Sequence, residues 1–104
     1  MAVAASPTEA QRDRSAVVAR ALADPKRLFV LENLADGGER SVGDLSRCVG
    51  CQVPNMSQHL SVLRAAGIVT SRRQGSTVLY RIADRSVLDL VGALQRVAGD
   101  RVAG

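Results

Sequence analysis

The stretch of residues 53–67 constrains the fold of this chain more than any other. Its apolar residues Met56, Leu60 and Leu63 recur at positions i, i+4 and i+7, which places them on one face of a helix. Gly67 suits the position just past a helix end. The opposite face is short, polar and free of acidic side chains. The sequence therefore predicts a helix with one face in a core and the other face open to a partner.

The charge of the chain is segregated around this helix. No acidic residue occurs between Asp44 and Asp84, whereas five arginines fall there: Arg47, Arg64, Arg72, Arg73 and Arg81. This segment carries +5, so the formal net charge of +4 leaves −1 for the remainder. Such segregation is the electrostatic footprint of a nucleic-acid face, and an uncharged polar helix face suits a DNA major groove. The alternative is a solvated basic surface.

Helices are also predicted upstream. Residues 1–11 lack apolar periodicity and are expected to form a flexible N-terminus, and small apolar residues favour a helix over 12–23. Asp24-Pro25 is typical of a new helix start. Ser41 can cap a further short helix that runs through Leu45 to about residue 48. A tight connection then leads into residues 53–67, so these two helices form a helix-turn-helix.

After Gly67 the apolar period changes from 3.6 to 2. Residues 68–73 and 77–82 are predicted strands, joined by a turn at residues 74–76. The first strand ends in two arginines, so the hairpin is a basic wing that can reach phosphate or the minor groove. The predicted fold is mainly α with a small β-hairpin (α+β), a winged helix-turn-helix in the order α-α-α-α-β-β-α. We expect one domain over residues 12–100, with a tail at 101–104.

The last predicted helix carries more apolar surface than so small a domain needs internally. Asp84 and Ser86 can cap this helix, and its apolar residues recur at near-heptad spacing. We expect the excess to form a homodimer interface with the first helix, made of Val17, Val18, Ala21, Val87, Leu90, Val91, Leu94 and Val97. The alternative is that all of these side chains pack in their own core.

The sequence favours a cytoplasmic protein with no membrane partner. No apolar run approaches the length of a membrane span, and the N-terminus lacks the pattern of a signal peptide. Two cysteines are too few for a disulfide scaffold, and in a reducing cytosol they would be free thiols, ligands or a redox pair.

Several motifs together resemble the ArsR/SmtB family of bacterial winged-helix repressors. They are A-L-A-D-P-K-R-L at residues 21–28, V-G-D-L at 42–45, P-N-M-S-Q-H-L-S-V-L-R-A-A-G-I-V at 54–69 and R-R-Q-G-S-T-V-L-Y-R-I at 72–82. The resemblance covers most of residues 16–98. It implies a symmetric homodimer that binds an inverted repeat in operator DNA on the bacterial nucleoid and leaves it when an inducer binds. Two recognition helices would then enter successive major grooves.

The resemblance and the side-chain chemistry together assign a DNA-contact set. Gln and Asn amides can pair with adenine, hydroxyls suit bases or phosphates, and arginines neutralise phosphates. The predicted set is Gln52, Asn55, Ser57, Gln58, His59, Ser61, Arg64, Arg72, Arg73, Gln74, Ser76 and Thr77. For His59 two interpretations stay open, a half-buried ring or a phosphate contact.

The metal sites of the family do not carry over to this chain. Arsenic and cadmium sensors look like C-V-C-D-L where this chain has S-V-G-D-L at residues 41–45. Zinc and nickel sensors place Asp and His on the last helix, where only Asp84 and Asp100 remain as weak candidates. A divalent metal, nickel or zinc, is kept as one hypothesis for the inducer or co-regulator. An accessory protein also stays open.

The remaining sensing candidates are Cys48 and Cys51, which flank Gly50 inside the helix-turn-helix. As a redox or soft-metal switch, they could re-aim the recognition helix when bridged. The alternative is that Cys48 is a small core residue next to Leu45 and Cys51 an incidental surface thiol.

The sequence disfavours two other classes of protein. An enzyme is disfavoured, because the sequence shows no catalytic triad, no paired carboxylates in an apolar setting and no phosphate-binding glycine loop. A winged-helix module that acts through protein-protein contacts is disfavoured by the acid-free span of residues 45–83, since a protein-docking face gains nothing from excluding carboxylates.

Overall fold

The computed structural model describes the backbone of residues 6–103 and the side chains of residues 6–99. Within these residues the chain forms five helices and three strands. In chain order they are α1 (Glu9–Leu22), α2 (Pro25–Asn33), β1 (Arg40–Ser41), α3 (Val42–Val49), α4 (Val53–Ala65), β2 (Val69–Gln74), β3 (Thr77–Ile82) and α5 (Arg85–Ala103). The predicted winged helix-turn-helix fold is confirmed.

Helix α4 packs on the core through its apolar stripe. Met56, Leu60 and Leu63 are each 0% exposed, as the i, i+4, i+7 spacing predicts. Gly67 adopts a left-handed φ of 77° directly after the helix, and the Ile68 N–H then donates to the Leu63 carbonyl over 2.9 Å. This arrangement ends the helix and turns the chain into β2.

The core forms where α2, α3 and α4 meet the base of the sheet, with the C-terminal end of α1 and one residue of α5 added. Its buried side chains are Ala21, Leu22, Val30, Leu31, Leu34, Leu45, Val49, Met56, Leu60, Leu63, Ile68, Val69, Ile82 and Val91. Two predicted interface residues, Ala21 and Val91, are thus core residues of the single chain. Their apolar spacing is the same as that of an interface, so only packing could separate the two roles.

The predicted hairpin gains a third strand. β2 pairs with β3 from Val69↔Ile82 to Gln74↔Thr77, and Gly75 supplies the left-handed residue of the turn with φ 64°. The sequence prediction missed β1, in which Arg40 pairs with Tyr80 across the sheet, giving the strand order β1-β3-β2. A strand of two residues is too short to show the alternation of apolar and polar residues, so β1 cannot be recognised from the sequence.

The first and last helices both extend beyond the bounds that the sequence predicts. α1 begins at Glu9 instead of residue 12, because Thr8 and Gln11 form a reciprocal capping box. At the other end α5 continues to Ala103, so the predicted tail at 101–104 is helical over 101–103. Residues 1–5 and 104 lie outside the described part of the chain.

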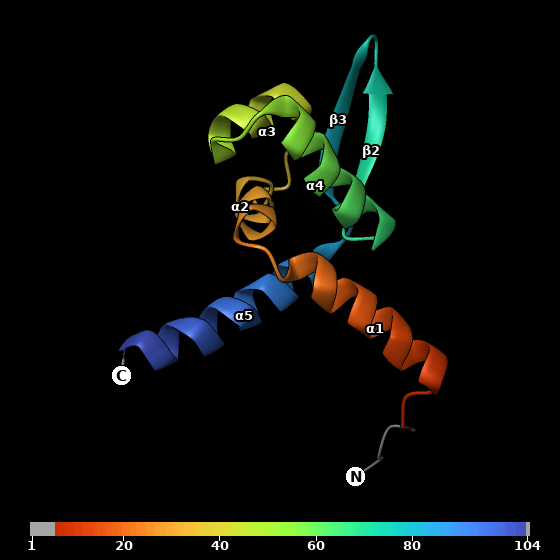
Figure 1. Cartoon of the computed structure of the whole chain (residues 1–104), viewed down its shortest axis with the longest axis vertical. Coiled ribbons are helices and arrows are strands. Elements are labelled where there is room, and N and C mark those ends of the chain that lie inside the picture. The colour runs from red at the N-terminus through yellow and green to blue at the C-terminus, as the bar shows by residue number, and fades with distance from the viewer. Residues whose placement is uncertain (1–5, 104) are drawn as a thin grey trace.

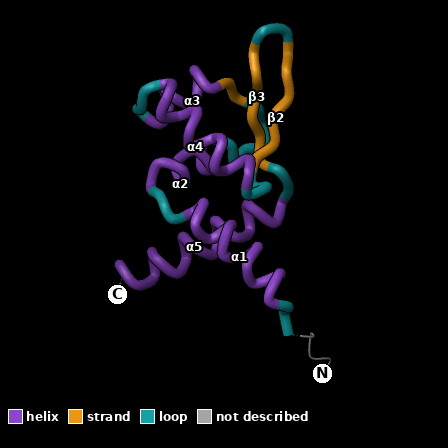
Figure 2. The backbone as a smooth tube through the Cα atoms, turned by 45° about the vertical axis from the view of Figure 1, so that its right-hand side comes forward, coloured by secondary structure: helices purple, strands orange, loops and turns teal. Residues whose placement is uncertain are grey.

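The molecule is elongated. Its Cα radius of gyration is 15.3 Å, against about 13 Å expected for a compact chain of this length. The free ends of α1 and α5 diverge at one end of the molecule, and the β2–β3 wing projects at the other (Figures 1 and 2). Among residues 6–103 no helix is both long and apolar enough to cross a membrane.

The turn of the helix-turn-helix depends on Gly50, whose φ is 79°. We expect Gly50→Ala to lower the free energy of unfolding by about 1–2 kcal/mol, because L side chains disfavour this left-handed backbone. An added Cβ meets no atom within 4 Å, so strain and not a clash causes the loss.

Gly99→Ala is the matched control, because Gly99 lies within α5 and its added Cβ also meets nothing within 4 Å. Removing a glycine from a helix should stabilise by about 0.5–1 kcal/mol. Urea unfolding at one fixed protein concentration measures both variants. Equal changes in the two would contradict a special role for Gly50.

Candidate nucleic-acid interface

The outer face of α4 is polar and exposed. The predicted contact residues on it are all exposed: Gln52, Asn55, Ser57, Gln58, Ser61 and Arg64. Gln52 occupies the N-cap position without a side-chain capping bond, so its amide stays available to a partner. Because the apolar stripe is fully buried, this face is held outward by the core. The DNA contacts of these residues stay a prediction.

The tip of the wing, the β2–β3 hairpin, carries the remaining residues of the predicted DNA-contact set. Arg73, Gln74, Ser76 and Thr77 are exposed around the turn between β2 and β3 (Figure 2). Antiparallel pairing runs to the last residue before the turn, so the two strands stay paired up to the tip of the hairpin. A basic tip on a paired hairpin can reach a phosphate or the minor groove.

Arg72 is already paired in this structure. Its Nε lies 2.6 Å from Oε2 of Glu39, and its Nη2 lies 2.7 Å from Oε1, a bidentate ion pair. The hydrogen bond from Arg72 holds the pKa of Glu39 below its ordinary value. Sequence reasoning missed Glu39, because Glu39 and Arg72 are 33 residues apart and Glu39 precedes the acid-free segment that begins after Asp44. To bind a DNA phosphate, the Arg72 guanidinium must therefore leave the Glu39 carboxylate or bind both groups at once.

His59 is half-buried, as one of the two sequence interpretations expected. Its ring Nδ1 lies 3.4 Å from Nη1 of Arg27, at the start of α2. The same guanidinium bonds the last carbonyls of α1, with Nε at 2.6 Å from the Ala21 oxygen and Nη2 at 3.3 Å from the Arg20 oxygen. Arg27 thus joins α1, α2 and α4, a role that no local sequence pattern indicates.

The two cysteines are free thiols on either side of Gly50, and their surroundings differ from the simple alternative raised by the sequence. Cys48 is exposed on α3, and it is Cys51 that is half-buried against the core. The stretch of helix before Gly50 buries Leu45 and Val49, which turns Cys48 outward. The proposed core role for Cys48 is therefore wrong.

The possible metal ligands of a single chain lie scattered over its described part. Within residues 6–99 no group of three His, Cys, Asp or Glu side chains comes together. Asp84 accepts hydrogen bonds from the Ser86 N–H over 2.7 Å and from the Ser86 hydroxyl, which lowers the pKa of its carboxyl group. Asp84 therefore caps the start of α5 together with Ser86, as the sequence predicts. The side chain of Asp100 lies outside the described part of the chain.

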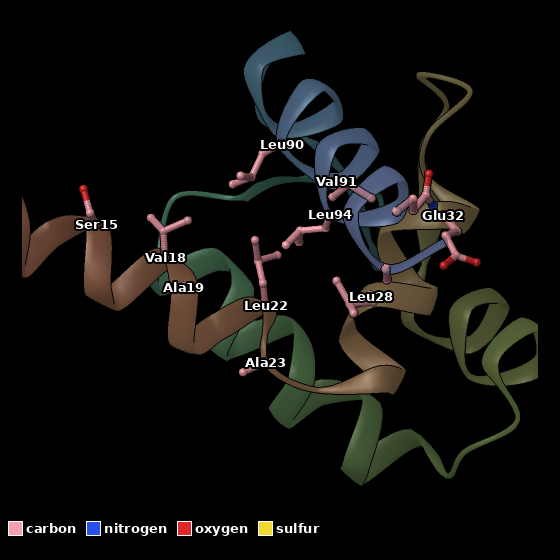
Figure 3. A pocket seen from close by; sticks show the side chains of 12 residues that line it. Ser15, Val18, Ala19, Leu22, Ala23, Leu28, Glu32, Leu90, Val91 and Leu94 are labelled. Atoms are coloured by element: carbon pink, nitrogen blue, oxygen red, sulfur yellow. The ribbon is translucent and has the colours of Figure 1, made fainter. Parts of the chain in front are cut away.

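A hollow apolar surface lies at the end of the molecule away from the wing. A groove of about 690 Å³ runs between α1, α2 and α5, lined by Val18 and Leu22 on one side and by Leu90 and Leu94 on the other, with Leu28 from α2 (Figure 3). Four of the predicted interface residues are at least 40% exposed: Val17, Leu90, Leu94 and Val97. Within the described chain, this apolar surface has no cover.

Comparison with known proteins defines the class. A helix-turn-helix domain family matches residues 22–72. The nodulation protein NolR of Rhizobium meliloti is 42% identical over 80 residues, 77% of this chain and 65% of NolR. The transcriptional repressor SmtB of Mycobacterium tuberculosis is 39% identical over 79 residues, 76% of this chain and 58% of SmtB. Both relatives are thus longer than the region that they share with this chain.

A solved structure matches almost the whole fold. The homodimeric winged helix-turn-helix DNA-binding domain from Mycobacterium bovis is similar with a TM-score of 0.83 and 36% identity, over 96% of this chain and 92% of that one. Fold and sequence therefore define a winged helix-turn-helix transcriptional regulator, which is not an enzyme. The chain belongs to the ArsR/SmtB family of DNA-binding transcriptional regulators.

The ion pair on the wing gives a direct titration test. We expect Arg72→Ala to raise the pKa of Glu39 toward its ordinary value of 4.5, because the bond that stabilises the ionised carboxylate is lost. In the native chain this depressed pKa means that the pair contributes stability at neutral pH and loses it as the pH falls through the folded-state pKa. Carboxyl-carbon NMR of Glu39 across pH 2–7 measures the shift, with Arg73→Ala as the control. An unchanged Glu39 pKa in Arg72→Ala would contradict the pairing.

Proposed function

We propose that the chain is a repressor that binds an inverted-repeat operator as a homodimer and releases it in response to a chemical signal. The observation that carries the proposal is the acid-free polar face of α4, held outward beside an arginine-bearing wing. On this hypothesis α4 enters the major groove and the wing reaches the flanking phosphates. We expect it to act on the nucleoid in the bacterial cytoplasm.

The proposed homodimer is supported by the apolar surface of α1 and α5. A second copy laid across this surface would bury exposed leucine and valine side chains, which favours association. The free ends of α1 and α5 lie at the opposite end of the molecule from the wing (Figure 1), so pairing through them would leave the polar face of α4 free in both copies. Two such helices related by a two-fold axis would read half-sites about 34–36 Å apart. The dimeric domain from Mycobacterium bovis has a similar fold.

The dimer can be tested by a charge placed on this surface. Leu94 is 41% exposed and lines the groove, so we expect Leu94→Glu to shift native mass spectra from dimer to monomer. Val62→Glu is the matched control, because Val62 is 40% exposed on α4, away from the groove. A dimer retained in Leu94→Glu, or lost equally in both variants, would count against this interface.

The roles on the DNA side separate into base reading and phosphate binding. We expect Gln58→Ala to reduce the discrimination between operator and random DNA by about 1–3 kcal/mol, because the amide can bond a base edge. Arg73→Ala should weaken binding to both and flatten the salt dependence, because a phosphate contact is lost.

The operator for this test is first selected from a random duplex library with the native chain, and fluorescence anisotropy then gives affinities at several salt concentrations. Arg96→Ala, which removes a positive charge from the exposed outer part of α5, is the matched control. Normal binding by both Gln58→Ala and Arg73→Ala would sink the assignment.

For the signal, we propose Cys48 and Cys51 as the receivers. Both thiols are free and flank the Gly50 turn, so a bridge or a soft metal between them would act on the start of α4. Nickel and zinc as inducers are less well supported, because two thiols are fewer than the four donors of a closed zinc site. Native mass spectrometry after exposure to nickel, zinc, cadmium, arsenite or an oxidant would report bound metal and disulfide state together. A Cys48→Ser/Cys51→Ser chain that still responds would exclude the thiols.

The second candidate function is a winged-helix module that acts through protein contacts. The Glu39–Arg72 ion pair favours it in one respect, since it places a carboxylate on the wing beside the basic strand. Titration of duplex DNA at two salt concentrations separates the two functions, because phosphate binding weakens steeply with salt. Absent or salt-independent binding would favour the protein-docking module.

A further inference from the structure

A small cavity opens between α4 and the start of α2. It has a volume of about 230 Å³ and is lined by Lys26, Arg27, Cys51, Asn55, Gln58, His59 and Val62. One water occupies roughly 30 Å³ of liquid, so the cavity has room for a tetrahedral oxyanion. Asn55 and Gln58 belong to the predicted DNA-contact set, and a duplex lying on α4 would therefore pass over its mouth.

The basic groups of this cavity have different tasks. The guanidinium of Arg27 is half-buried and committed to the carbonyls of α1 and to His59. Lys26 is exposed, and only its backbone N–H is engaged, by Asp24 over 2.8 Å. The Lys26 ammonium group is therefore the free cation of the cavity within the described residues.

Asp24 is the acidic group that faces the cavity residues. Its carboxylate accepts the N–H groups of Lys26 and Arg27 and lies 3.8 Å from the Arg27 guanidinium. These hydrogen bonds, led by the one from Arg27, lower the pKa of Asp24 and commit its charge to the start of α2. Asp24 thus offsets Arg27 and leaves the charge of Lys26 uncompensated.

The contact with Arg27 also selects which ring nitrogen carries the proton when His59 is neutral. A guanidinium carries donors only, so in the contact of 3.4 Å the ring Nδ1 accepts. The neutral ring then carries its proton on Nε2, which makes His59 a hydrogen-bond donor on the recognition helix. A cation and an N–H donor at one cavity are the groups that bind a phosphate oxygen.

We propose that Lys26 and His59 form a subsite for a backbone phosphate of the bound DNA, with Arg27 as the positioning residue for the imidazole. This inference rests on the proposed DNA-binding function and adds α2 to the predicted contact set. The contact would set the register of α4 without reading a base.

Salt-dependent affinity tests the lysine. In the full chain, we expect Lys26→Ala to weaken binding to a random-sequence duplex about fivefold to tenfold per contact at 0.1 M salt and to reduce the log–log salt slope by about 0.9 per lost contact. Arg96→Ala removes the same charge from outer α5 and should leave both quantities unchanged. A native chain that binds no duplex refutes the proposed function itself. A native chain that binds while Lys26→Ala binds equally well refutes the subsite alone.

The single lysine of the chain allows a direct view of the contact. Reductive methylation with ¹³C-formaldehyde keeps its charge and gives one dimethyl-lysine NMR signal, separate from that of the terminal amine. We expect the duplex to shift this signal to saturation, and inorganic phosphate at equal ionic strength to leave it nearly unmoved. Saturation by inorganic phosphate without a shift on DNA identifies a free-anion site and overturns the DNA assignment.

His59 is the single histidine, so its ring nitrogens test the positioning role. Long-range ¹H–¹⁵N spectra at alkaline pH should show one tautomer with the proton on Nε2, and Arg27→Lys should give a mixture. For DNA affinity, Arg27→Lys/His59→Ala should bind as His59→Ala does, because Arg27 acts through the ring. A purely structural Arg27 would leave the tautomer unchanged and make the two losses additive.

Discussion

The structure depends on the burial of one side of α4. Met56, Leu60 and Leu63 are completely enclosed, and they meet residues of α2, α3, β2 and β3 in a single core. Each fully buried side chain of this size contributes about 1.5–3 kcal/mol relative to an exposed one. That burial holds the helix in one orientation. The polar face on its opposite side therefore points outward.

The same constraint explains the division of the molecule into two ends. The core takes up the middle helices and the base of the sheet, and the chain before and after it is left with apolar stripes that the core does not need. α1 and α5 carry these stripes at one end, and the wing carries arginines at the other. A small domain gains apolar burial by pairing, and in the proposed dimer, pairing at this end would keep the basic end free for DNA.

The contacts that connect these parts are polar and span long distances in the sequence. Arg27 joins the last carbonyls of α1 to the ring of His59 on α4. Glu39 ties the segment before β1 to the wing through Arg72. Each of these contacts links a structural segment to a predicted DNA-contact residue. A shift of α1 or of the segment before β1 would therefore move His59 or Arg72 in the candidate nucleic-acid interface.

The sequence by itself determined the fold class, the apolar stripe of α4, the helix-turn-helix and the presence of the hairpin, because each of these follows from local periodicity, caps and turn residues. It also indicated the polar outer face and the basic span. The register of the hairpin, with Gln74 paired to Thr77, came from the structure. Only the tertiary structure decided that Arg72 is engaged by Glu39, that Ala21 and Val91 belong to the core, that Cys51 and not Cys48 is half-buried, and that Lys26 shares a cavity with His59. These features depend on which side chains from distant segments come together, and a period of 3.6 or 2 carries no information about that.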